Sequence, residues 1–359
     1  MPEFPTDGQA ASRLPSIKSL DKGGLRTLME RLGQPAYRAR QVAAWLYGTA
    51  PAVPLTSFEQ MTDLPRSLRE RLAATCTLDA PQILRRQDSR DGSRKYLVQL
   101  AGGNAVETVA IPAGHDRLTV CFSTQAGCAL GCVFCATGQA GLVRSLGAGE
   151  MVDQLRVASE DFGLRVTNAV AMGQGEPFAN YNAVLGALRL LNDERLGGIG
   201  ARRLTVSTCG LLDGIRRFAE EPEQFTLAVS LHSAVQATRD RLMPGLASQP
   251  LTELREELAY YAASSGRRPS LEYLLIDGVN DTPEELEALI GFARGQGALN
   301  YHVNLIVLNK TAGGRLEPSP PERLQAFANS LLQARVNATI RASRGADIQA
   351  ACGQLAEVV

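Results

Sequence analysis

The sequence lacks any apolar run of about 18 residues, the length that a membrane-spanning helix needs. Its N-terminus, MPEFPTDGQAAS, lacks the charged-then-apolar pattern of a secretion signal. An excess of charge is also missing, because 37 basic residues balance 37 acidic ones in 359 residues. We therefore expect a cytoplasmic protein without a membrane span. Hydrophobic residues make up 45% of the chain, enough for a large core.

Histidine is scarce, with three residues, and the seven cysteines are an odd number. Structural disulfides are disfavoured in a reducing compartment. Three of the cysteines, Cys128, Cys132 and Cys135, are closely spaced in the sequence, which indicates metal binding. No paired Cys or His lies nearby to complete a tetrahedral zinc site.

The front of the chain is mildly basic. Residues 1–100 carry 15 Lys and Arg against 10 Asp and Glu. This balance suits a phosphate-contacting module, but a solvated basic surface explains it equally well.

The patterning divides the chain into a helical front and an α/β body. Leu25, Leu28, Met29 and Leu32 share one helical face, and prolines 51, 54 and 65 break this front into short helices. Turn pairs at Asp91-Gly92 and Gly102-Gly103 predict a β-hairpin. We predict these segments: 1–15 disordered, 16–80 a helical accessory domain, 81–115 a β-hairpin linker, 116–345 a barrel, and 346–359 a tail carrying Cys352.

Six β-rich runs alternate with helical stretches after Leu118, which predicts a parallel sheet covered by helices. The runs are 118–123, 167–172, 204–209, 226–231, 270–276 and 302–308, and a short further run is 336–343. Unusual residues follow the strand ends, where α/β barrels place their chemistry.

The central motif is Cys128-Ala-Leu-Gly-Cys132-Val-Phe-Cys135. Iron–sulfur clusters usually have four thiolate ligands, so three close cysteines leave one iron open for an outside ligand. This loop resembles that of the radical S-adenosylmethionine (SAM) superfamily. The resemblance implies a partial (β/α)6 barrel and one [4Fe–4S] cluster whose open iron binds SAM. Gly173-Gln174-Gly175-Glu176-Pro177 resembles the superfamily's second-strand motif for the methionine amino group.

Two outlying cysteines narrow the resemblance. Cys121 lies in CFSTQAGC and Cys352 in AACGQL. Both contexts resemble the radical SAM 23S rRNA (adenine-C2)-methyltransferases and their antibiotic-resistance relatives. The likeness covers nearly the whole chain and includes YRARQVAAWLY, VETVAIP, CATG, SLHS, EYLLIDGVND and YHVNLI.

The resemblance implies a radical route, since carbon 2 of adenine is too electron-poor to attack SAM as a nucleophile. Cys352 would take a methyl group from one SAM, and a radical derived from a second SAM would activate that methyl group. Glu107 would accept the ring proton, and Cys121 would form a transient disulfide with Cys352 that releases the product. From residue type alone, Glu107 reads better as a surface carboxylate, and Cys121 and Cys352 could be small packing residues.

The resemblance also assigns positions after strands two, three, four and six to SAM binding: Gly175, Glu176, Ser207, Ser230, Leu231, His232 and Asn309. A lone histidine such as His232 is more often a core residue. Leu308-Asn309-Lys310 departs from the family, which often has an aromatic residue and then Asn-Pro here. We interpret Cys76, Cys209 and His302 as structural.

The expected substrates are 23S rRNA and, as an open question, the adenosine 3′ of the anticodon in some tRNAs. Candidate phosphate contacts are Arg38, Arg40, Arg85, Arg86, Arg90, Arg94 and Lys95. Tyr37 and Trp45 could stack on bases, although helical spacing favours a core role for Trp45. We expect a monomer that receives electrons from a low-potential donor of flavodoxin or ferredoxin type.

Two alternatives remain. One is a C8-specific adenine methyltransferase of the antibiotic-resistance type, which would share the same catalytic residues. Glu176 followed by Pro177, rather than by Ala, favours the C2 enzyme. The other is a non-catalytic iron–sulfur RNA-binding protein, which would have no need for Cys352.

Overall fold

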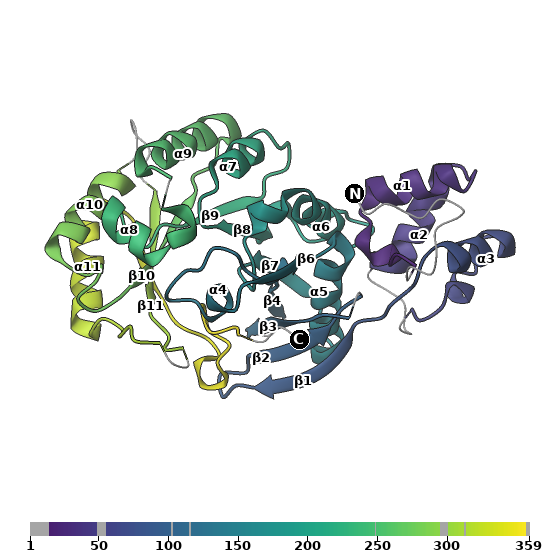
Figure 1. Cartoon of the computed structure of the whole chain (residues 1–359), viewed down its shortest axis with the longest axis horizontal. Helices are drawn as coiled ribbons and strands as arrows, with labels where there is room; N and C mark the ends of the chain where they lie inside the picture. Colours follow the sequence, from purple (N-terminus) through teal and green to yellow (C-terminus); the bar gives the residue numbers. More distant parts are fainter. Residues whose placement is uncertain are drawn as a thin grey trace.

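The protein is described by a computed structural model, which covers residues 14–48, 55–101, 103–114, 116–247, 249–294, 301–311 and 314–356. Residues 1–13 of the predicted disordered N-terminus lie outside the described residues. Figure 1 shows the small helical domain on one side and the larger α/β body on the other. None of the described helices is both long and apolar enough to cross a membrane.

Ten strands form one continuous sheet in the order β1-β2-β3-β4-β7-β8-β9-β10-β11-β12. The strands are β1 (Gln82–Asp88), β2 (Arg94–Gln99), β3 (Ala105–Ala113), β4 (Arg117–Cys121), β7 (Val166–Ala171), β8 (Leu204–Thr208), β9 (Thr226–Ser230), β10 (Ser270–Leu275), β11 (His302–Val307) and β12 (Ala338–Arg341). From β4 to β12 all neighbours are parallel, and from β1 to β4 they are antiparallel.

The predicted α/β architecture is confirmed, and the six predicted barrel strands agree with the structure within about a residue at either end. The segment 81–115 is hydrogen-bonded into the same sheet, because Val109 of β3 pairs with Cys121 of β4. A separate two-stranded sheet of β5 (Gln125–Gly127) and β6 (Leu142–Ser145) flanks the cysteine loop.

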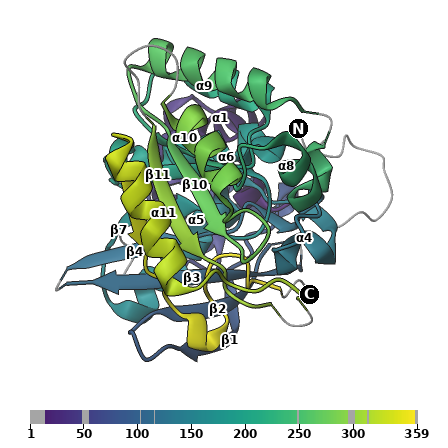
Figure 2. The same ribbon diagram turned by 90° about the vertical axis from the view of Figure 1, so that its left-hand side faces the viewer.

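Helices flank the parallel strands (Figures 1 and 2). They are α4 (Ala136–Ala140), α5 (Ala148–Phe162), α6 (Tyr181–Asn192), α7 (Leu212–Ala219), α8 (Gln236–Leu242), α9 (Leu251–Ser265), α10 (Pro283–Ala293) and α11 (Pro321–Gln333). Short 3-10 turns are η3 (Pro177–Asn180), η4 (Ala201–Arg203), η5 (Pro244–Leu246) and η6 (Ala346–Ile348).

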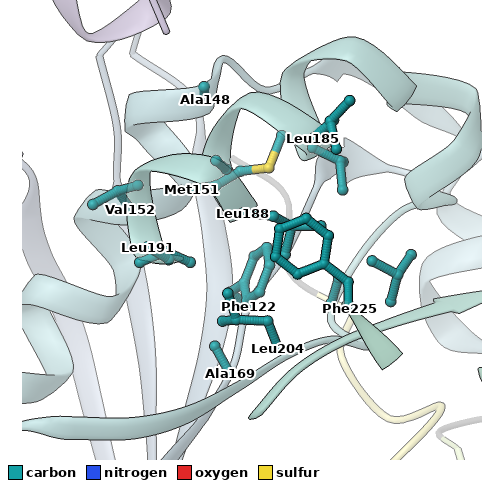
Figure 3. Close-up of a cluster of buried hydrophobic side chains, with 14 of the residues drawn as sticks. Phe122, Ala148, Met151, Val152, Ala169, Leu185, Leu188, Leu191, Leu204 and Phe225 are labelled. Carbon is teal, nitrogen blue, oxygen red and sulfur yellow. The ribbon is translucent and has the colours of Figure 1, made fainter. Parts of the chain in front are cut away.

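The core between α5, α6 and the sheet shows why these helices pack where they do. Met151 and Leu155 are four residues apart on α5, and both are buried with Leu188 of α6 (Figure 3). Phe122, directly after β4, is fully buried in the same cluster. Each buried side chain of this size contributes roughly 1.5–3 kcal/mol. The start of the cysteine loop is therefore anchored in the core.

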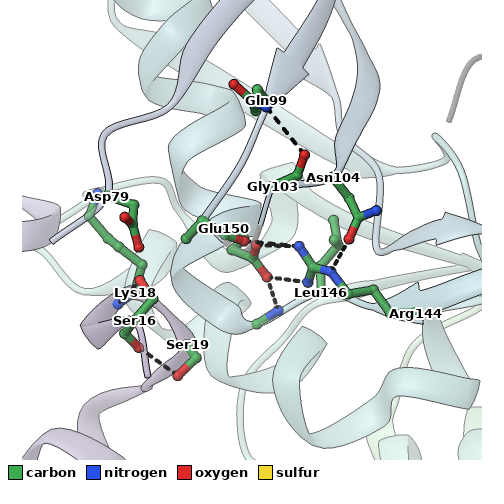
Figure 4. A network of polar contacts seen from close by, with 12 residues as sticks. Ser16, Lys18, Ser19, Asp79, Gln99, Gly103, Asn104, Arg144, Leu146 and Glu150 are labelled. Atoms are coloured by element: carbon green, nitrogen blue, oxygen red, sulfur yellow. Dashed lines mark hydrogen bonds and ion pairs between the residues drawn. The ribbon is translucent and has the colours of Figure 1, made fainter. Parts of the chain in front are cut away.

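A polar network fixes the far side of that loop (Figure 4). Arg144 of β6 donates two hydrogen bonds to Glu150 at 2.8 and 2.9 Å and one to Asn104 at 2.8 Å. Glu150 in turn accepts from the Gly147 N–H and caps α5. The β5–β6 sheet is thereby tied to both α5 and the β2–β3 turn.

The accessory domain comprises η1 (Ile17–Ser19), α1 (Lys22–Arg31), α2 (Tyr37–Tyr47), η2 (Phe58–Gln60) and α3 (Arg66–Thr75). It joins the barrel through a buried ion pair of 2.5 Å between Lys18 and Asp153 of α5. Arg156 of α5 also donates to the Leu46 carbonyl at 2.6 Å. Cys76 is buried in this domain, and its thiol donates to the Leu72 carbonyl at 3.2 Å, as its structural interpretation expects.

Candidate active site at the cysteine-lined cavity

The cysteine loop depends on a glycine at its entrance. Gly127 has φ +80°, and a Cβ there would lie 1.9 Å from the Gly141 carbonyl oxygen. That carbonyl accepts from the Cys128 N–H at 2.9 Å. On its other side the loop is held by α8 and η5, because Val133 donates to the Leu242 carbonyl and Leu130 accepts from Gly245.

A cavity of about 150 Å³ opens at the C-terminal ends of the barrel strands. Predicted site residues that line it are Cys128, Cys132, Cys135, Gly175, Glu176, Ser207, Ser230, His232 and Cys352. Six parallel strands, β7 to β12, thus contribute to the same cavity as the cysteine loop and the C-terminal segment, as the strand order predicts.

The three loop cysteines differ in environment. Burial raises the pKa of Cys128 to about 11 and also raises that of Cys135, whereas a hydrogen bond with the Cys209 thiol lowers the pKa of Cys132. Among the described residues, no three His, Cys, Asp or Glu side chains lie close enough together to hold a metal ion. A cubane cluster needs wider spacing, since each thiolate binds a different iron. Three thiols on one cavity wall suit such a cluster.

Cys209 follows β8 and lines the cavity beside Cys132, and its structural interpretation stays a prediction. Its hydrogen bond to Cys132, together with burial, raises its pKa well above the ordinary value. It is therefore a thiol donor beside a candidate cluster ligand rather than a fourth thiolate.

Glu176 is 2% exposed and shapes the cavity wall. Its carboxylate accepts from the Phe178 N–H at 2.9 Å, from the Thr208 hydroxyl at 2.7 Å and from the Cys209 N–H at 2.7 Å. Burial raises its pKa, while these hydrogen bonds oppose the shift. Both oxygens are thus engaged by the chain.

His232 lies on the cavity wall with φ +55° and packs edge-on against Phe134 of the cysteine loop, with ring centroids 4.7 Å apart. Its Nδ1 accepts from the Leu274 N–H at 3.1 Å. Burial, together with the charge of Arg239, lowers its pKa to about 3. The imidazole is therefore neutral and leaves Nε2 as its N–H donor.

Cys352 and Gly353 are the tail residues that line the cavity; Cys352 is exposed as a residue, although protein atoms surround its thiol. Arg341 and Glu272, also on the wall, are 3.3 Å apart. Burial raises the pKa of the Cys352 thiol, and the charge of Arg341 opposes the shift. The sequence interpretation missed both wall residues; their signal is a charged residue within an apolar strand.

The other predicted site residues lie around the cavity rather than on its described wall. Cys121, at the end of β4, packs against a small cluster formed by Val109, Ala350 and Leu355, and the last two lie on either side of Cys352 in the sequence. Burial and the neighbouring Cys352 raise its pKa to about 12, and both cysteines are free of disulfides. Leu231 is fully buried, and Asn309 donates its amide to the Cys352 carbonyl at 3.4 Å. Within Leu308-Asn309-Lys310, this contact with the tail is thus made by Asn309, which the family's Asn-Pro pattern shares.

Glu107 is 1% exposed, so the interpretation of this residue as a surface carboxylate is wrong. It forms a 2.9 Å ion pair with Lys95 and accepts from the Ala356 N–H at 2.6 Å. The predicted phosphate contact of Lys95 is wrong as well, because its side chain is buried against this carboxylate.

The remaining basic candidates are largely engaged by the chain. Arg86 and Arg94 both pair with Asp161 at 2.7 Å. Trp45 is half-buried and donates to Asp63 at 2.5 Å, whereas Tyr37 is exposed. His302 is hydrogen-bonded to Thr339 at 2.8 Å, which agrees with a structural role.

A parallel barrel whose first strand leads into three cysteines at one cavity defines a radical SAM protein. A sequence model of the Radical SAM superfamily matches residues 122–293. A second model, described as the ribosomal RNA large subunit methyltransferase N-terminal domain, matches residues 16–78.

Similar proteins show which family of radical SAM proteins the chain belongs to. The chain is 43% identical over 92% of its length to a "Probable dual-specificity RNA methyltransferase RlmN" of Gloeobacter violaceus, covering 92% of that protein. A protein of the same description from Moorella thermoacetica is 44% identical over 92% of this chain and 94% of its own. The chain therefore belongs to the RlmN family of RNA methyltransferases.

A solved structure supports the same placement. The crystal structure of a radical SAM methyltransferase from Sphaerobacter thermophilus matches with a TM-score of 0.85 and 42% identity. The match covers 96% of this chain and 100% of that one. The helical accessory domain and the barrel thus recur together in a solved relative.

Proposed function

We propose that the chain methylates carbon 2 of an adenosine in 23S rRNA and the adenosine 3′ of the anticodon in some tRNAs. The dual-specificity description of its relatives supports two RNA targets, and the match of residues 16–78 to the ribosomal RNA large subunit methyltransferase N-terminal domain supports rRNA as one of them. The observation that carries the proposal is that Cys352 lines the same cavity as Cys128, Cys132 and Cys135. A protein that only bound RNA would have no use for a thiol there.

Cys128, Cys132 and Cys135 are the candidate ligands of one [4Fe–4S] cluster, and Gly175, Glu176, Ser207, Ser230, Leu231, His232 and Asn309 are the candidate SAM contacts. When bound, the cluster and SAM supply a 5′-deoxyadenosyl radical. The residues of the chain would do the rest. The neutral His232 offers its Nε2–H as a hydrogen-bond donor in the cavity. Glu176 fixes the cavity wall by accepting a hydrogen bond from the Cys209 N–H.

Cys352 is proposed to carry the methyl group, taken by displacement from one SAM, while a second SAM is consumed as the radical source. Its place on the cavity wall lets a cofactor reach the sulfur. Cys121 is proposed to attack the Cys352 sulfur as a thiolate and form a disulfide. The bond between that sulfur and the transferred carbon breaks, and the carbon keeps the electron pair and takes up a proton, which leaves a methyl group on the base. The packing of Cys121 against the cluster that includes Ala350 and Leu355 of the tail supports this role.

Glu107 is proposed as the proton acceptor. Lys95 and the Ala356 N–H engage its carboxylate, so the tail must shift before Glu107 can face a base in the cavity. This requirement links proton transfer to movement of the tail.

The remaining proposals concern the roles of the segments, the electron donor, the oligomeric state and the compartment. Residues 16–80 would bind RNA, 81–115 and 116–345 would support the site, and 346–359 would deliver Cys352. A flavodoxin or ferredoxin type donor would supply electrons to a monomer in the cytoplasm, where thiols stay reduced.

The experiment is anaerobic reaction of the reconstituted enzyme with rRNA and methyl-labelled SAM, followed by mass mapping of the modified base. Wild type should give 2-methyladenosine. Cys352→Ala should abolish methylation, Cys121→Ala should accumulate protein-linked RNA, and the control Cys76→Ala should retain methylation. A methyl group on carbon 8, or full activity of Cys352→Ala, would overturn the proposal.

A further inference from the structure

The segment that carries Cys352, here called the C-terminal tail (Gly345–Ala356), is held by several parts of the sheet and barrel. Before Cys352, Asp347 accepts from the Ser89 hydroxyl at 2.5 Å and from the Arg90 N–H at 3.1 Å, both in the β1–β2 turn. After Cys352, the Leu355 carbonyl accepts from Thr137 of α4 at 2.5 Å.

Lys95 and Glu107 contact the tail on both sides of Cys352. The Lys95 ammonium donates to the Gln349 carbonyl at 3.1 Å, three residues before Cys352. The Glu107 carboxylate accepts from the Ala356 N–H at 2.6 Å, four residues after it. A direct ion pair of 2.9 Å joins the two side chains.

The sheet register explains how the pair forms. Lys95 of β2 lies opposite Val109 of β3, and Glu107 is two residues along the same face. This diagonal placement on neighbouring antiparallel strands fixes the charges below the tail.

The hydrogen bond from Lys95 falls on a strained residue. Gln349 has φ +53°, a left-handed conformation that a residue other than glycine rarely adopts. A charge-assisted hydrogen bond to its carbonyl offsets the cost of this conformation. Without Lys95, we expect the backbone before Cys352 to relax.

A buried ion pair is a poor source of net stability, because desolvation of both charges offsets their attraction. Its position is more informative: the pair bridges the two ends of the segment that presents Cys352. We propose that Lys95 is a positioning residue, and that the Lys95–Glu107 pair holds the tail so that Cys352 faces the cavity. The relevance to methyl transfer rests on the proposed function; the ordering of the tail does not.

The test is hydrogen–deuterium exchange on the full-length, cluster-loaded protein. In Lys95→Met, amides of residues 346–356 should exchange about tenfold faster or more, the loss expected for one charge-assisted hydrogen bond. Lys95→Arg should stay near wild type. The matched control is Lys22→Met, which removes an exposed pair with Asp193 far along the chain.

Unchanged tail exchange in Lys95→Met would overturn the proposal, and so would an equal rise across the barrel. If Lys95→Met fails to fold, Lys95→Gln replaces it; this variant keeps a donor but no charge and should show a smaller rise confined to the tail.

A second readout separates the two proposals. In Lys95→Met, the fraction of Cys352 carrying a methyl group, measured by mass spectrometry, should fall more than SAM cleavage does. If Cys352 is never methylated in wild type, the proposed function fails while the exchange result still decides the positioning role. If Cys352 methylation and SAM cleavage fell equally in Lys95→Met, that result would contradict a positioning role for Lys95.

Discussion

The Glu176 carboxylate accepts a hydrogen bond from the Cys209 backbone N–H across 2.7 Å, joining the loop after β7 to the loop after β8. The same carboxylate also accepts hydrogen bonds from the Thr208 hydroxyl and the Phe178 N–H. One buried side chain therefore satisfies three donors at the base of the cavity.

Glu176→Ala should destabilise the fold by about 2–4 kcal/mol, because two buried N–H groups lose their acceptor. Urea unfolding of the cluster-free protein measures this change. Glu194→Ala, at an exposed carboxylate, should stay within about 0.5 kcal/mol of wild type. Similar values for the two variants would show that the Glu176 hydrogen bonds do not support the wall.

Gly127→Ala should prevent iron binding. Gly127 and Gly141 share a left-handed φ near +80°, but only at Gly127 would a Cβ collide with backbone, 1.9 Å from the Gly141 carbonyl oxygen. Gly141→Ala, with nothing within 4 Å of its Cβ, should cost about 1–3 kcal/mol of backbone strain and meet no collision. Iron per chain after reconstitution should fall in the first variant and persist in the second. Equal iron in both would contradict the collision argument.

His232 should make the fold sensitive to acid. Its folded-state pKa of about 3 lies below the unfolded value of 6.5, so the neutral imidazole stabilises the fold fully above pH 6.5. That stabilisation should be lost by roughly 1.4 kcal/mol per pH unit as pH falls from 6.5 towards 3.

His232→Asn keeps an acceptor for the Leu274 N–H and has no titrating ring. Urea unfolding between pH 7 and pH 4 should therefore show a shallower decline in this variant. A decline as steep as that of wild type would mean that other groups dominate.

The Lys18–Asp153 ion pair should stabilise the contact between the accessory domain and the barrel. Both side chains are at most 3% exposed, so Lys18→Met leaves a carboxylate buried without its cation and should cost about 3–5 kcal/mol. Lys22→Met, at a pair 44% and 30% exposed, should cost less than about 1 kcal/mol. Thermal unfolding of both variants measures this difference in stability. Equal decreases in melting temperature would contradict the prediction.

The sequence predicted the barrel strands well because short β-rich runs separated by helical stretches are typical of a parallel sheet covered by helices. It also indicated the cysteine loop and Cys352, through motifs similar to a known family. Lys95 was misjudged because its role comes from contacts outside its own segment. Lys95 contacts Gln349 across 254 positions, and such a pairing leaves no local pattern.

The exposure of Glu107 was misjudged for a related reason. On an alternating strand, a carboxylate suggests a solvent-facing position, yet β3 is covered by the tail from the other end of the chain. Its burial could be predicted only from the tertiary arrangement.

The joining of β3 to β4 has a mechanical consequence. Five paired positions, from Val109–Cys121 to Ala113–Arg117, lock the hairpin strands to the strand that leads into the cysteine loop. Separating β3 from β4 would break this row of ladder bonds, so the hairpin strands and the strand that leads to Phe122 form one hydrogen-bonded unit. A force on the β1–β2 turn would therefore reach β4 through these bonds.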